Sequence, residues 1–474
     1  MRPTPQRART STIVRRALTA TLTMGILCGG NAVAGPVVAA APPSPPRDAF
    51  YDHPADLATL APGSIIRTRK ITARSLQLLP INVDAWQLLY RTSGADKQPD
   101  ATVTTVLVPR GKRPTKLLSY QAATDSTLRQ CNPSYSLRTG LPVSFSTRPG
   151  PLTFALPGAE VLLASAGLAQ GWAVALPDHG GTSARFLTPR QPGYATLDGI
   201  RAVQNFSPMR MSAKTPVGLW GYSGGAIASS WAIEEKQSYA PELTITGAAF
   251  GAPERDLTAS LRSVNGALLG GLIPIALDGI SKDSPGFRTA IRRYLTPQGR
   301  AVLAETGNQC IGQNALLNLW FDYRRYLTKP LNVVLADPVI KREIAARSIT
   351  GRSTSVPTYI YNGVNEEVAP ISGTDKLVRS YCAGGAPVTY RRELLPPNIP
   401  QQIFSTHGTV AITGAPGAFA WLKSRMNSGG APARSGCDVS TVPATLTNAG
   451  ALGELGPSFI VNPLATMLGL PIGS

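Results

Sequence analysis

The chain of 474 residues carries 46 lysines and arginines against 27 aspartates and glutamates, which gives a formal net charge of +19. The basic residues are scattered and form no stripe interleaved with aromatic residues, which argues against a nucleic-acid-binding protein. The charge favours attraction to an anionic envelope or interface, and an ordinary solvated basic surface is the equally simple alternative.

Residues 1–34 have the pattern of a secretory signal peptide. Five arginines precede or flank an apolar run at 17–27 that is too short to span a bilayer, and Ala32-Val33-Ala34 is a small-residue cleavage pattern. A second such pattern lies at 39–41. Loss of the arginines would lower the net charge to about +14, and no other segment has transmembrane length. We therefore expect an exported protein, either secreted or associated with the cell envelope.

Four cysteines follow this segment, namely Cys131, Cys310, Cys382 and Cys437. An even number of cysteines in an exported protein favours two disulfides, for which three pairings exist. Buried free thiols are the alternative interpretation.

An arm rich in alanine and proline, 35–58, precedes the first strand patterns. Alternating β-branched residues predict strands, and from residue 159 onward strands alternate with helical patterns. This alternation predicts a mostly parallel sheet covered on both faces by helices, whose first part spans 59–254. The predicted strands are 64–70, 84–92, 101–108, 116–120, 172–176, 217–220 and 243–250, and the predicted helices are 159–170, 193–205 and 226–235.

Residues 255–352 show helical patterns and no strand pattern. An all-helical stretch inserted between two strands is typical of a cap that covers an active site and forms an apolar acyl pocket. The apolar run 268–277 would either line such a pocket or form the core of the cap. The predicted cap helices are 257–269, 287–295, 298–305, 313–326 and 339–346.

The alternation resumes in 353–427, which completes the core. The C-terminal extension, 428–474, begins with a flexible loop and is then neutral to apolar and interrupted by proline and glycine, so no element is predicted there. The predicted strands of this part are 357–361 and 387–392, and the predicted helices are 373–382 and 415–426.

The sequence Gly221-Tyr222-Ser223-Gly224-Gly225 lies between a predicted strand and a predicted helix. This context is typical of a nucleophile elbow, which strains the serine backbone and exposes its hydroxyl, while the flanking glycines let strand and helix approach closely. The elbow predicts Ser223 as a nucleophile and the N–H of Gly224 as a donor to an oxyanion. A glycine-rich turn is the alternative, because the pattern also arises by chance in a chain with 46 glycines.

A serine nucleophile requires a base, and the chain has three histidines: His53, His179 and His407. His53 lies in the N-terminal arm and is predicted to be a surface residue. His179 follows a predicted strand but precedes Ser223, which is the wrong order for the base of such a sheet enzyme. His407 lies in a predicted loop after the last strand and is therefore the predicted base.

The base is oriented by an acid, which we expect after a strand between Ser223 and His407. Glu366 and Glu367 are the only carboxylates in the loop 362–370. One of them is predicted to accept the Nδ1–H of the histidine, and the residues alone leave open which. Two solvated glutamates are the simpler interpretation on spacing alone.

Taken together, the sequence resembles a secretory lipase of the lipase A type, a branch of the α/β-hydrolases. The resemblance covers about residues 64–426 and is carried by an ordered set of stretches. These are 101–109, 119–121 with 125–126, 171–172, 177–181, 197–202, the elbow 221–225, and 365–370 followed by His407.

The resemblance implies an α/β-hydrolase fold with a helical cap, Ser223 as nucleophile and His407 as base. The acid of the family is normally an aspartate, whose place Glu366 occupies here. The additional methylene requires a shifted loop and leaves Glu367 open as the orienting acid.

The resemblance further implies that Asp125 and the backbone of Gly224 donate to the oxyanion. It implies the disulfides Cys131–Cys310 and Cys382–Cys437, and it requires no metal and no cofactor.

These inferences predict an exported serine hydrolase that cleaves esters of lipids such as triacylglycerols through an acyl-enzyme, with contact to lipid at an interface. An acyltransferase acting on envelope lipids with the same triad is the alternative, because the acceptor depends on how the cap excludes water. A non-catalytic binding protein on the same fold is a third interpretation, supported only by the glutamate in place of aspartate.

Overall fold

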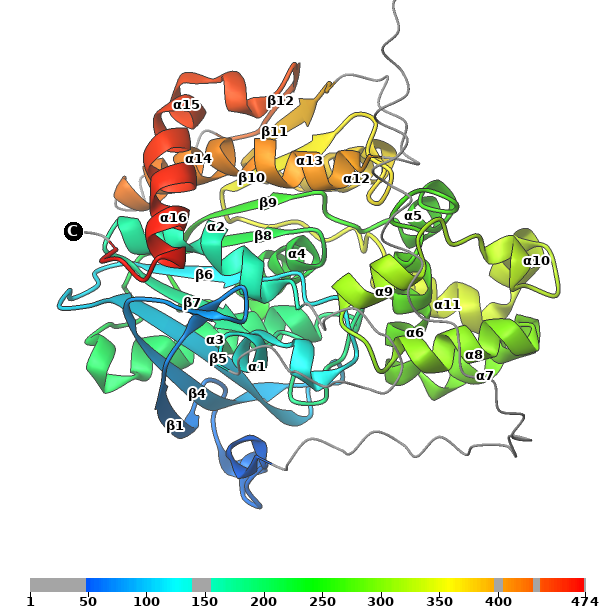
Figure 1. The fold of residues 1–474 in the computed structure, drawn as a ribbon, viewed down its shortest axis with the longest axis horizontal. Helices are drawn as coiled ribbons and strands as arrows, with labels where there is room; N and C mark the ends of the chain where they lie inside the picture. Colours follow the sequence, from blue (N-terminus) through cyan, green and yellow to red (C-terminus); the bar gives the residue numbers. More distant parts are fainter. Residues whose placement is uncertain (1–47, 139–154, 396–403, 429–434, 473–474) are drawn as a thin grey trace, which may run out of the picture. The chain divides into compact units, whose positions relative to one another are not determined.

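The computed structural model describes residues 48–138, 155–395, 404–428 and 435–472 (Figure 1). The predicted signal peptide, residues 35–47 of the predicted arm and most of the predicted loop 428–436 therefore lie outside the described residues. Within the described ranges, each helix is either too short or too polar to cross a membrane.

A central sheet organises the fold. Its strands are β1 (Ile65–Ile71), β4 (Val83–Ser93), β5 (Pro99–Pro109), β6 (Leu117–Gln121), β7 (Ala173–Pro177), β8 (Val217–Tyr222), β9 (Ile245–Gly251), β10 (Thr358–Gly363), β11 (Val388–Glu393) and β12 (Cys437–Val442). The described residues form this sheet in the order β1-β4-β5-β7-β6-β8-β9-β10-β11-β12, beside a small ladder of β2 (Arg74–Ser75) and β3 (Leu79–Pro80).

Strand direction divides the sheet into two parts. The pairs β1–β4, β4–β5 and β5–β7 are antiparallel, and every pair from β7 to β12 is parallel. The prediction of a mostly parallel sheet is confirmed. Because parallel strands end at a common edge, residues that follow β6, β8, β9 and β10 come together there.

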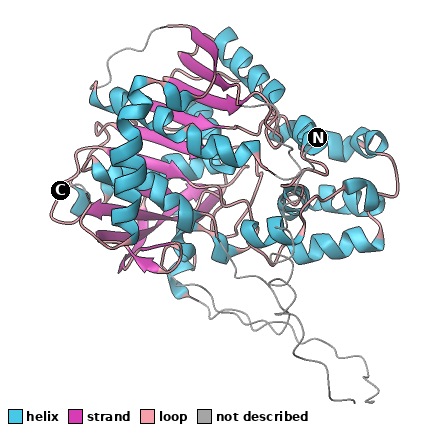
Figure 2. Cartoon of the chain, turned by 45° about the horizontal axis from the view of Figure 1, so that its top comes forward, coloured by secondary structure: helices cyan, strands magenta, loops and turns pink. Residues whose placement is uncertain are grey.

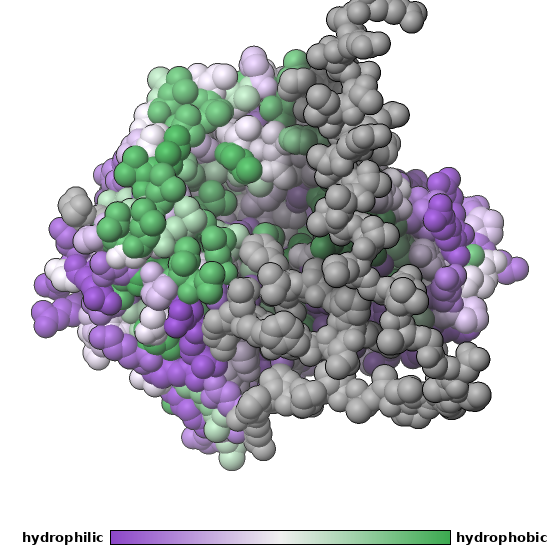
Figure 3. Space-filling view, in the orientation of Figure 1, coloured by the Kyte–Doolittle hydropathy of each residue, from purple (hydrophilic) through white to green (hydrophobic). Residues whose placement is uncertain are grey.

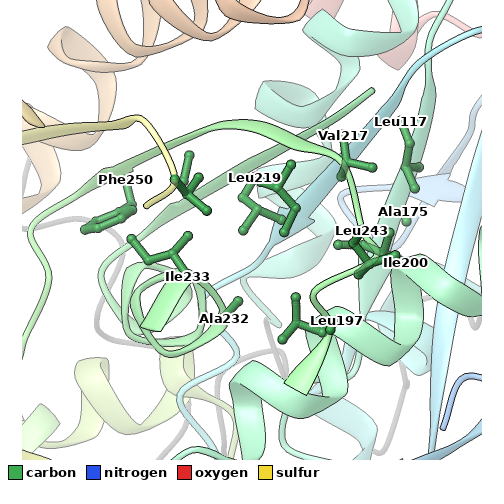
Figure 4. Packing of buried hydrophobic residues seen from close by; sticks show 14 of the residues in the cluster. Leu117, Ala175, Leu197, Ile200, Val217, Leu219, Ala232, Ile233, Leu243 and Phe250 are labelled. Carbon is green, nitrogen blue, oxygen red and sulfur yellow. The ribbon is translucent and has the colours of Figure 1, made fainter. Parts of the chain in front are cut away.

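Helices cover both faces of the sheet (Figure 2). They are α1 (Pro133–Ser136), α2 (Pro157–Ala169), α3 (Gln191–Asn205), α4 (Gly224–Tyr239), α12 (Ile371–Ala383), α13 (Thr406–Thr413) and α14 (Ala415–Asn427). On one face, Leu197 of α3 and Ile233 of α4 belong to the same buried cluster as Leu219 and Phe250 of the sheet (Figure 4). Because side chains alternate along a strand, the neighbouring residue Trp220 points to the other face, where it packs with Phe419 of α14.

A helical insertion lies between β9 and β10, on the right in Figure 1. It is made of α5 (Leu257–Ser263), α6 (Leu272–Asp283), α7 (Pro285–Tyr294), α8 (Pro297–Thr306), α9 (Ile311–Leu317), η5 (Tyr323–Arg325), α10 (Leu331–Ala336) and α11 (Pro338–Arg347). We refer to residues 255–352 as the helical insertion.

Glycine and tertiary contacts shorten the first predicted helix of this insertion. The helix predicted at 257–269 ends with α5, because Gly266 has a φ of +76° and its N–H donates to the carbonyl of Phe321 at 2.9 Å. The apolar run at 268–277 then enters α6, a helix that the sequence pattern did not predict.

The helix predicted at 313–326 is also wrong, since it is divided into α9 and η5. Between them Trp320 has a φ of +55°, which a helix does not accept. Asp322 caps η5 and accepts a hydrogen bond from Asn265 at 3.0 Å, so contacts with a distant segment fix the turn.

The C-terminal extension is more regular than its sequence suggested. Its first residues form β12, which pairs parallel to β11 as the last strand of the sheet. A continuous helical segment follows, made of α15 (Ala449–Gly456), the π-helical turn η7 (Pro457–Val461) and α16 (Asn462–Met467).

Disulfides join Cys131 to Cys310 and Cys382 to Cys437 in the described residues. This is the pairing that the family resemblance implied. The first links the loop after β6 to the start of α9, and the second links α12 to β12.

Candidate active site

Ser223 lies at the sharp turn between β8 and α4. Its φ of +53° is a strained conformation for a residue with a side chain. A Cβ atom on Gly225 would overlap the carbonyl of Gln121 in β6, and one on Gly221 would lie 2.5 Å from the carbonyl oxygen of Gly225. Only glycine fits at these two positions, which explains the sequence around the serine.

His407 reaches Ser223 from the first turn of α13. The loop predicted at this position is wrong, because Ser405 caps a helix that begins at the next residue. Nε2 of His407 lies 2.8 Å from Oγ of Ser223. The hydroxyl of Tyr222 donates to the carbonyl of His407 at 2.7 Å and so fixes the backbone that carries the imidazole.

Glu366 and Glu367 contact different parts of His407. Oε1 of Glu366 lies 2.8 Å from Nδ1 of the imidazole and also accepts the backbone N–H of Val368 at 2.7 Å. Glu367 instead accepts the backbone N–H of His407 at 3.2 Å and the hydroxyl of Ser405 at 2.5 Å. The imidazole is therefore oriented by the first glutamate, and the start of α13 by the second.

The two carboxyl groups also set the protonation of the imidazole. Burial lowers the pKa of His407, but the charge of Glu366 and its hydrogen bond raise it more, so the net pKa lies above the ordinary value. Burial raises the pKa of Glu367, and the nearby charge of Glu366 raises it further.

Asp125 lies in the loop after β6, against the start of α4. Its backbone has a φ of +38°, and its side chain is buried. A Cβ atom on Gly224 would overlap its Oδ1, so the carboxyl is in contact with that glycine. Burial raises the pKa of Asp125 to about 7, so near neutral pH a large fraction of the group is a carboxylic acid that can donate a hydrogen bond.

The loop that carries Asp125 is held by two buried side chains. Nε2–H of His179 donates to the carbonyl of Ala122 at 2.7 Å, and Oε2 of Glu160 accepts the N–H of Ala123 at 2.8 Å. Burial lowers the pKa of His179, which keeps the ring neutral, and burial raises the pKa of Glu160 to about 8. These contacts fix both sides of the peptide group between Ala122 and Ala123, two residues before Asp125. His53, by contrast, is exposed and lies 2.8 Å from the hydroxyl of Thr182.

An apolar cavity extends from Asp125 into the helical insertion. Its polar lining residues are Asp125, Glu254, Ser260 and Tyr323, and the others are apolar. Most of the apolar lining comes from α5, α6, α7, α10 and α11, and it includes Leu261, Ile273, Ala276, Leu277, Ile280, Phe287, Val334 and Ile344. A cavity with this lining suits an apolar ligand.

Sequence reasoning missed Glu160 and Glu254. Glu254 follows β9 at the same sheet edge as Ser223, and burial raises its pKa to about 8. Its place after a predicted strand was a usable signal. Glu160 carried only a weak signal, a lone carboxylate in an otherwise apolar helix, because its partner Ala123 lies 37 residues away.

The site thus contains a hydroxyl, an imidazole and a carboxylate in hydrogen-bond order, with a protonatable carboxyl beside the serine. This is the set of groups that nucleophilic acyl transfer requires.

Comparisons with known proteins show what this chain is similar to. The profile of the secretory lipase family matches residues 147–436. Lipase A of Arthroderma benhamiae is 36% identical over 445 residues, which cover 92% of this chain and 91% of that protein. A Mycobacterium tuberculosis protein named "Probable inactive lipase MT1628" is 37% identical over 384 residues, which cover 80% and 82% of the two chains. The X-ray structure of Candida antarctica lipase A has a TM-score of 0.72 and 26% sequence identity, with coverage of 90% of this chain and 97% of that one.

Proposed function

The chain belongs to the secretory lipase family and is an ester hydrolase of α/β-hydrolase fold, and we propose that it cleaves lipid esters such as triacylglycerols with a triad of Ser223, His407 and Glu366. The observation that carries this proposal is the series of hydrogen-bond contacts from Oγ of the serine through both ring nitrogens to the carboxylate.

Acylation begins with the neutral imidazole. Nδ1–H of His407 donates to Glu366, which leaves Nε2 free to take the proton of Ser223 as its Oγ attacks the ester carbonyl carbon. Glu366 stabilises the imidazolium that forms. The imidazolium then protonates the alkoxide of the leaving alcohol, and the acyl group remains on the serine.

Deacylation repeats these steps with water. His407 takes a proton from the water molecule, the resulting nucleophile attacks the acyl carbon, and Ser223 leaves as it regains a proton from the imidazolium. The products are a carboxylic acid and the free enzyme.

We assign oxyanion stabilisation to the N–H of Gly224 and to the protonated carboxyl of Asp125. The N–H lies at the N-terminus of α4, where the helix dipole favours negative charge. The contact between Asp125 and Gly224 supports their action on one oxygen atom. A single donor of this kind contributes about 3 kcal/mol to transition-state stabilisation.

The acyl chain of the substrate would occupy the cavity inside the helical insertion, which would act as a cap. The cavity is lined mostly by aliphatic side chains and has Asp125 in its wall, so a bound chain would leave its carbonyl at the proposed oxyanion site. Family membership and the two disulfides of the described residues indicate an extracellular location. The basic composition supports retention at an anionic envelope.

The proposal is tested with Ser223→Ala, measured on p-nitrophenyl esters and on emulsified triacylglycerol. We expect loss of hydrolysis and of covalent labelling by a fluorophosphonate, with an unchanged thermal midpoint. Because one relative bears the name of an inactive lipase, labelling of the unmodified protein is an essential part of the test. Hydrolysis retained by the variant, or an unmodified protein that forms no adduct, would overturn the triad.

A further inference from the structure

The C-terminal helical segment 449–467 reverses the usual distribution of side chains. Four of the five buried residues are polar and recur at every fourth position, and the outward residues are largely apolar. The four are Glu454, Ser458, Asn462 and Thr466, and the fifth buried residue is Ala451. A helix on the surface of a globular protein normally has the opposite pattern.

The buried polar side chains all have partners. Nζ of Lys423 donates to Oε1 of Glu454 at 2.7 Å, and the hydroxyl of Ser458 donates to Oε2 at 2.5 Å. Nδ2 of Asn462 donates to Oγ of Ser165 in α2 at 2.7 Å. These specific contacts fix which face of the helix points outward, so the exposed apolar side chains are a defined feature of the fold.

The outward face is apolar and uncharged. Glu454 is the only charged residue in 449–472 and is buried, while Val461 and Leu468 are 63% and 71% exposed. Figure 3 shows a continuous hydrophobic stripe over the region that α15 and α16 occupy in Figure 1. Its exposed members are Leu452, Ile460, Val461, Leu464, Leu468 and Leu470. We call this stripe the C-terminal face; contiguous apolar surface of this kind marks an interaction site.

We propose that the C-terminal face docks the protein on a lipid surface that carries anionic headgroups. An apolar helix face buries well at the boundary between headgroups and acyl chains, and nearby basic residues strengthen the attachment. The chain supplies them: the exposed residues Arg110, Lys112 and Arg113 lie in the loop between β5 and β6.

Aromatic contacts connect that basic loop to the helix. Nζ of Lys116, at the end of the loop, lies 5.9 Å from the ring of Trp172, whose ring is 5.9 Å from Phe419. Phe419 in turn packs at 6.0 Å against Phe459 of the helical segment. The end of the C-terminal face approaches the basic region more directly, because a Cβ atom on Gly469 would lie 3.4 Å from the carbonyl oxygen of Pro80 and the next residue, Ile81, lines a surface hollow with Lys70 and Arg110. A symmetric second copy docked on the same face would bring like charges together, which disfavours a dimer.

The position of the face separates docking from substrate entry. The C-terminal helix packs against α2 and α14 over one face of the sheet, and Figure 1 shows it on the left, with the helical insertion on the right. Docking would thus hold the protein on a surface while leaving the insertion and its cavity free. This docking rests on the C-terminal face and not on the triad, so the docking test can fail independently of the proposed function.

The experiment measures binding of Ser223→Ala protein to vesicles of phosphatidylcholine and phosphatidylglycerol in equal parts, by flotation. Adding Leu464→Ser and Leu468→Ser should weaken binding about tenfold or more, because two inserted side chains are lost. The matched control adds Leu316→Ser and Leu317→Ser, which are 54% and 53% exposed in the helical insertion and should leave binding unchanged. With Ser223 intact, both pairs should retain the thermal midpoint and hydrolysis of p-nitrophenyl butyrate.

A second measurement locates the contact directly. Leu464→Cys labelled with an environment-sensitive fluorophore should show increased emission when vesicles are added, and the same label at Leu316→Cys should not. The proposal would be overturned if all variants bound equally or if the control pair lost as much binding. It would also be overturned if sedimentation showed a dimer that is dissociated by Leu464→Ser with Leu468→Ser.

Discussion

The carboxyl of Asp125 and the backbone of Gly224 are in direct contact, since a Cβ atom on the glycine would overlap Oδ1 of the aspartate. Among the described residues, that oxygen has no hydrogen-bond partner. A buried polar atom without a partner is costly unless a ligand supplies one. The oxygen that develops negative charge on the substrate would be that partner.

The protonation of Asp125 should limit activity at high pH. His407 acts as a base only when neutral, so kcat/KM should rise with pH through the pKa of the histidine, which lies above its ordinary value. Asp125 donates only when protonated, so kcat/KM should fall as the pH rises above about 7, to which burial raises its pKa. Asp125→Asn, whose amide donates at every pH, should lose the fall on the alkaline side.

The comparison variant is Asp125→Ala, which should lower kcat about 100-fold to 1,000-fold below pH 7, where Asp125 donates, and by less at alkaline pH, where the unmodified protein has also lost this donor. Rates on p-nitrophenyl butyrate across the pH range provide the measurement. An alkaline fall that persists unchanged in Asp125→Asn would show that another group is responsible.

The two glutamates of the acid loop should differ in their effect on turnover. Glu366→Gln removes the charge that stabilises the imidazolium, and its amide N–H can donate to Nδ1 and so select the wrong tautomer, so kcat should fall about 1,000-fold or more. Glu367→Gln preserves an oxygen acceptor for the backbone N–H of His407, so we expect a loss of about tenfold or less. Steady-state kinetics on the same ester provide the measurement, with thermal midpoints as the control for folding. A larger loss of kcat in Glu367→Gln than in Glu366→Gln would refute the assignment of Glu366 as the orienting acid.

Glu160 should act as a positioning residue for the loop of Asp125. Glu160→Ala removes the acceptor of the Ala123 N–H, and the displaced loop should lower kcat about tenfold to 100-fold with little change in KM. Glu160→Gln retains an acceptor oxygen and should restore most of the rate. A purely structural role would instead lower the thermal midpoint and leave kcat of the folded fraction unchanged.

The cavity should determine which acyl chains are accepted. Ala276 lies in its wall on α6, and Ala276→Trp would fill it with an indole ring. We expect hydrolysis of long-chain p-nitrophenyl esters to fall about tenfold or more relative to the butyrate ester. Ala301→Trp, at an exposed position of α8, is the matched control. An equal loss of hydrolysis on esters of all chain lengths would mean that the acyl chain binds elsewhere.

The parts of the site with local signals were predictable from sequence. Ser223 was recognisable because strand, turn and helix patterns meet around it, and His407 because the other two histidines lie in unsuitable places. Nothing local distinguishes Glu366 from Glu367, since the choice depends on how the loop 362–370 folds against α13.

The elements that were mispredicted depend on distant partners. The helix predicted at 257–269 stops where Gly266 bonds to Phe321, which is remote in sequence. The C-terminal helix has its polar residues inside and therefore lacks the pattern that marks an ordinary surface helix. β12 became recognisable only through its pairing with β11.

The disulfide between Cys131 and Cys310 fastens the loop of Asp125 to α9, and Ser126 reinforces the junction by donating to the carbonyl of Gln309 at 2.8 Å. The position of Asp125 is consequently tied to that of α9. A displacement of α9 would move Asp125, the proposed oxyanion donor, away from Gly224 and so stop hydrolysis until the helix returned. Reduction of the disulfide should weaken this mechanical link.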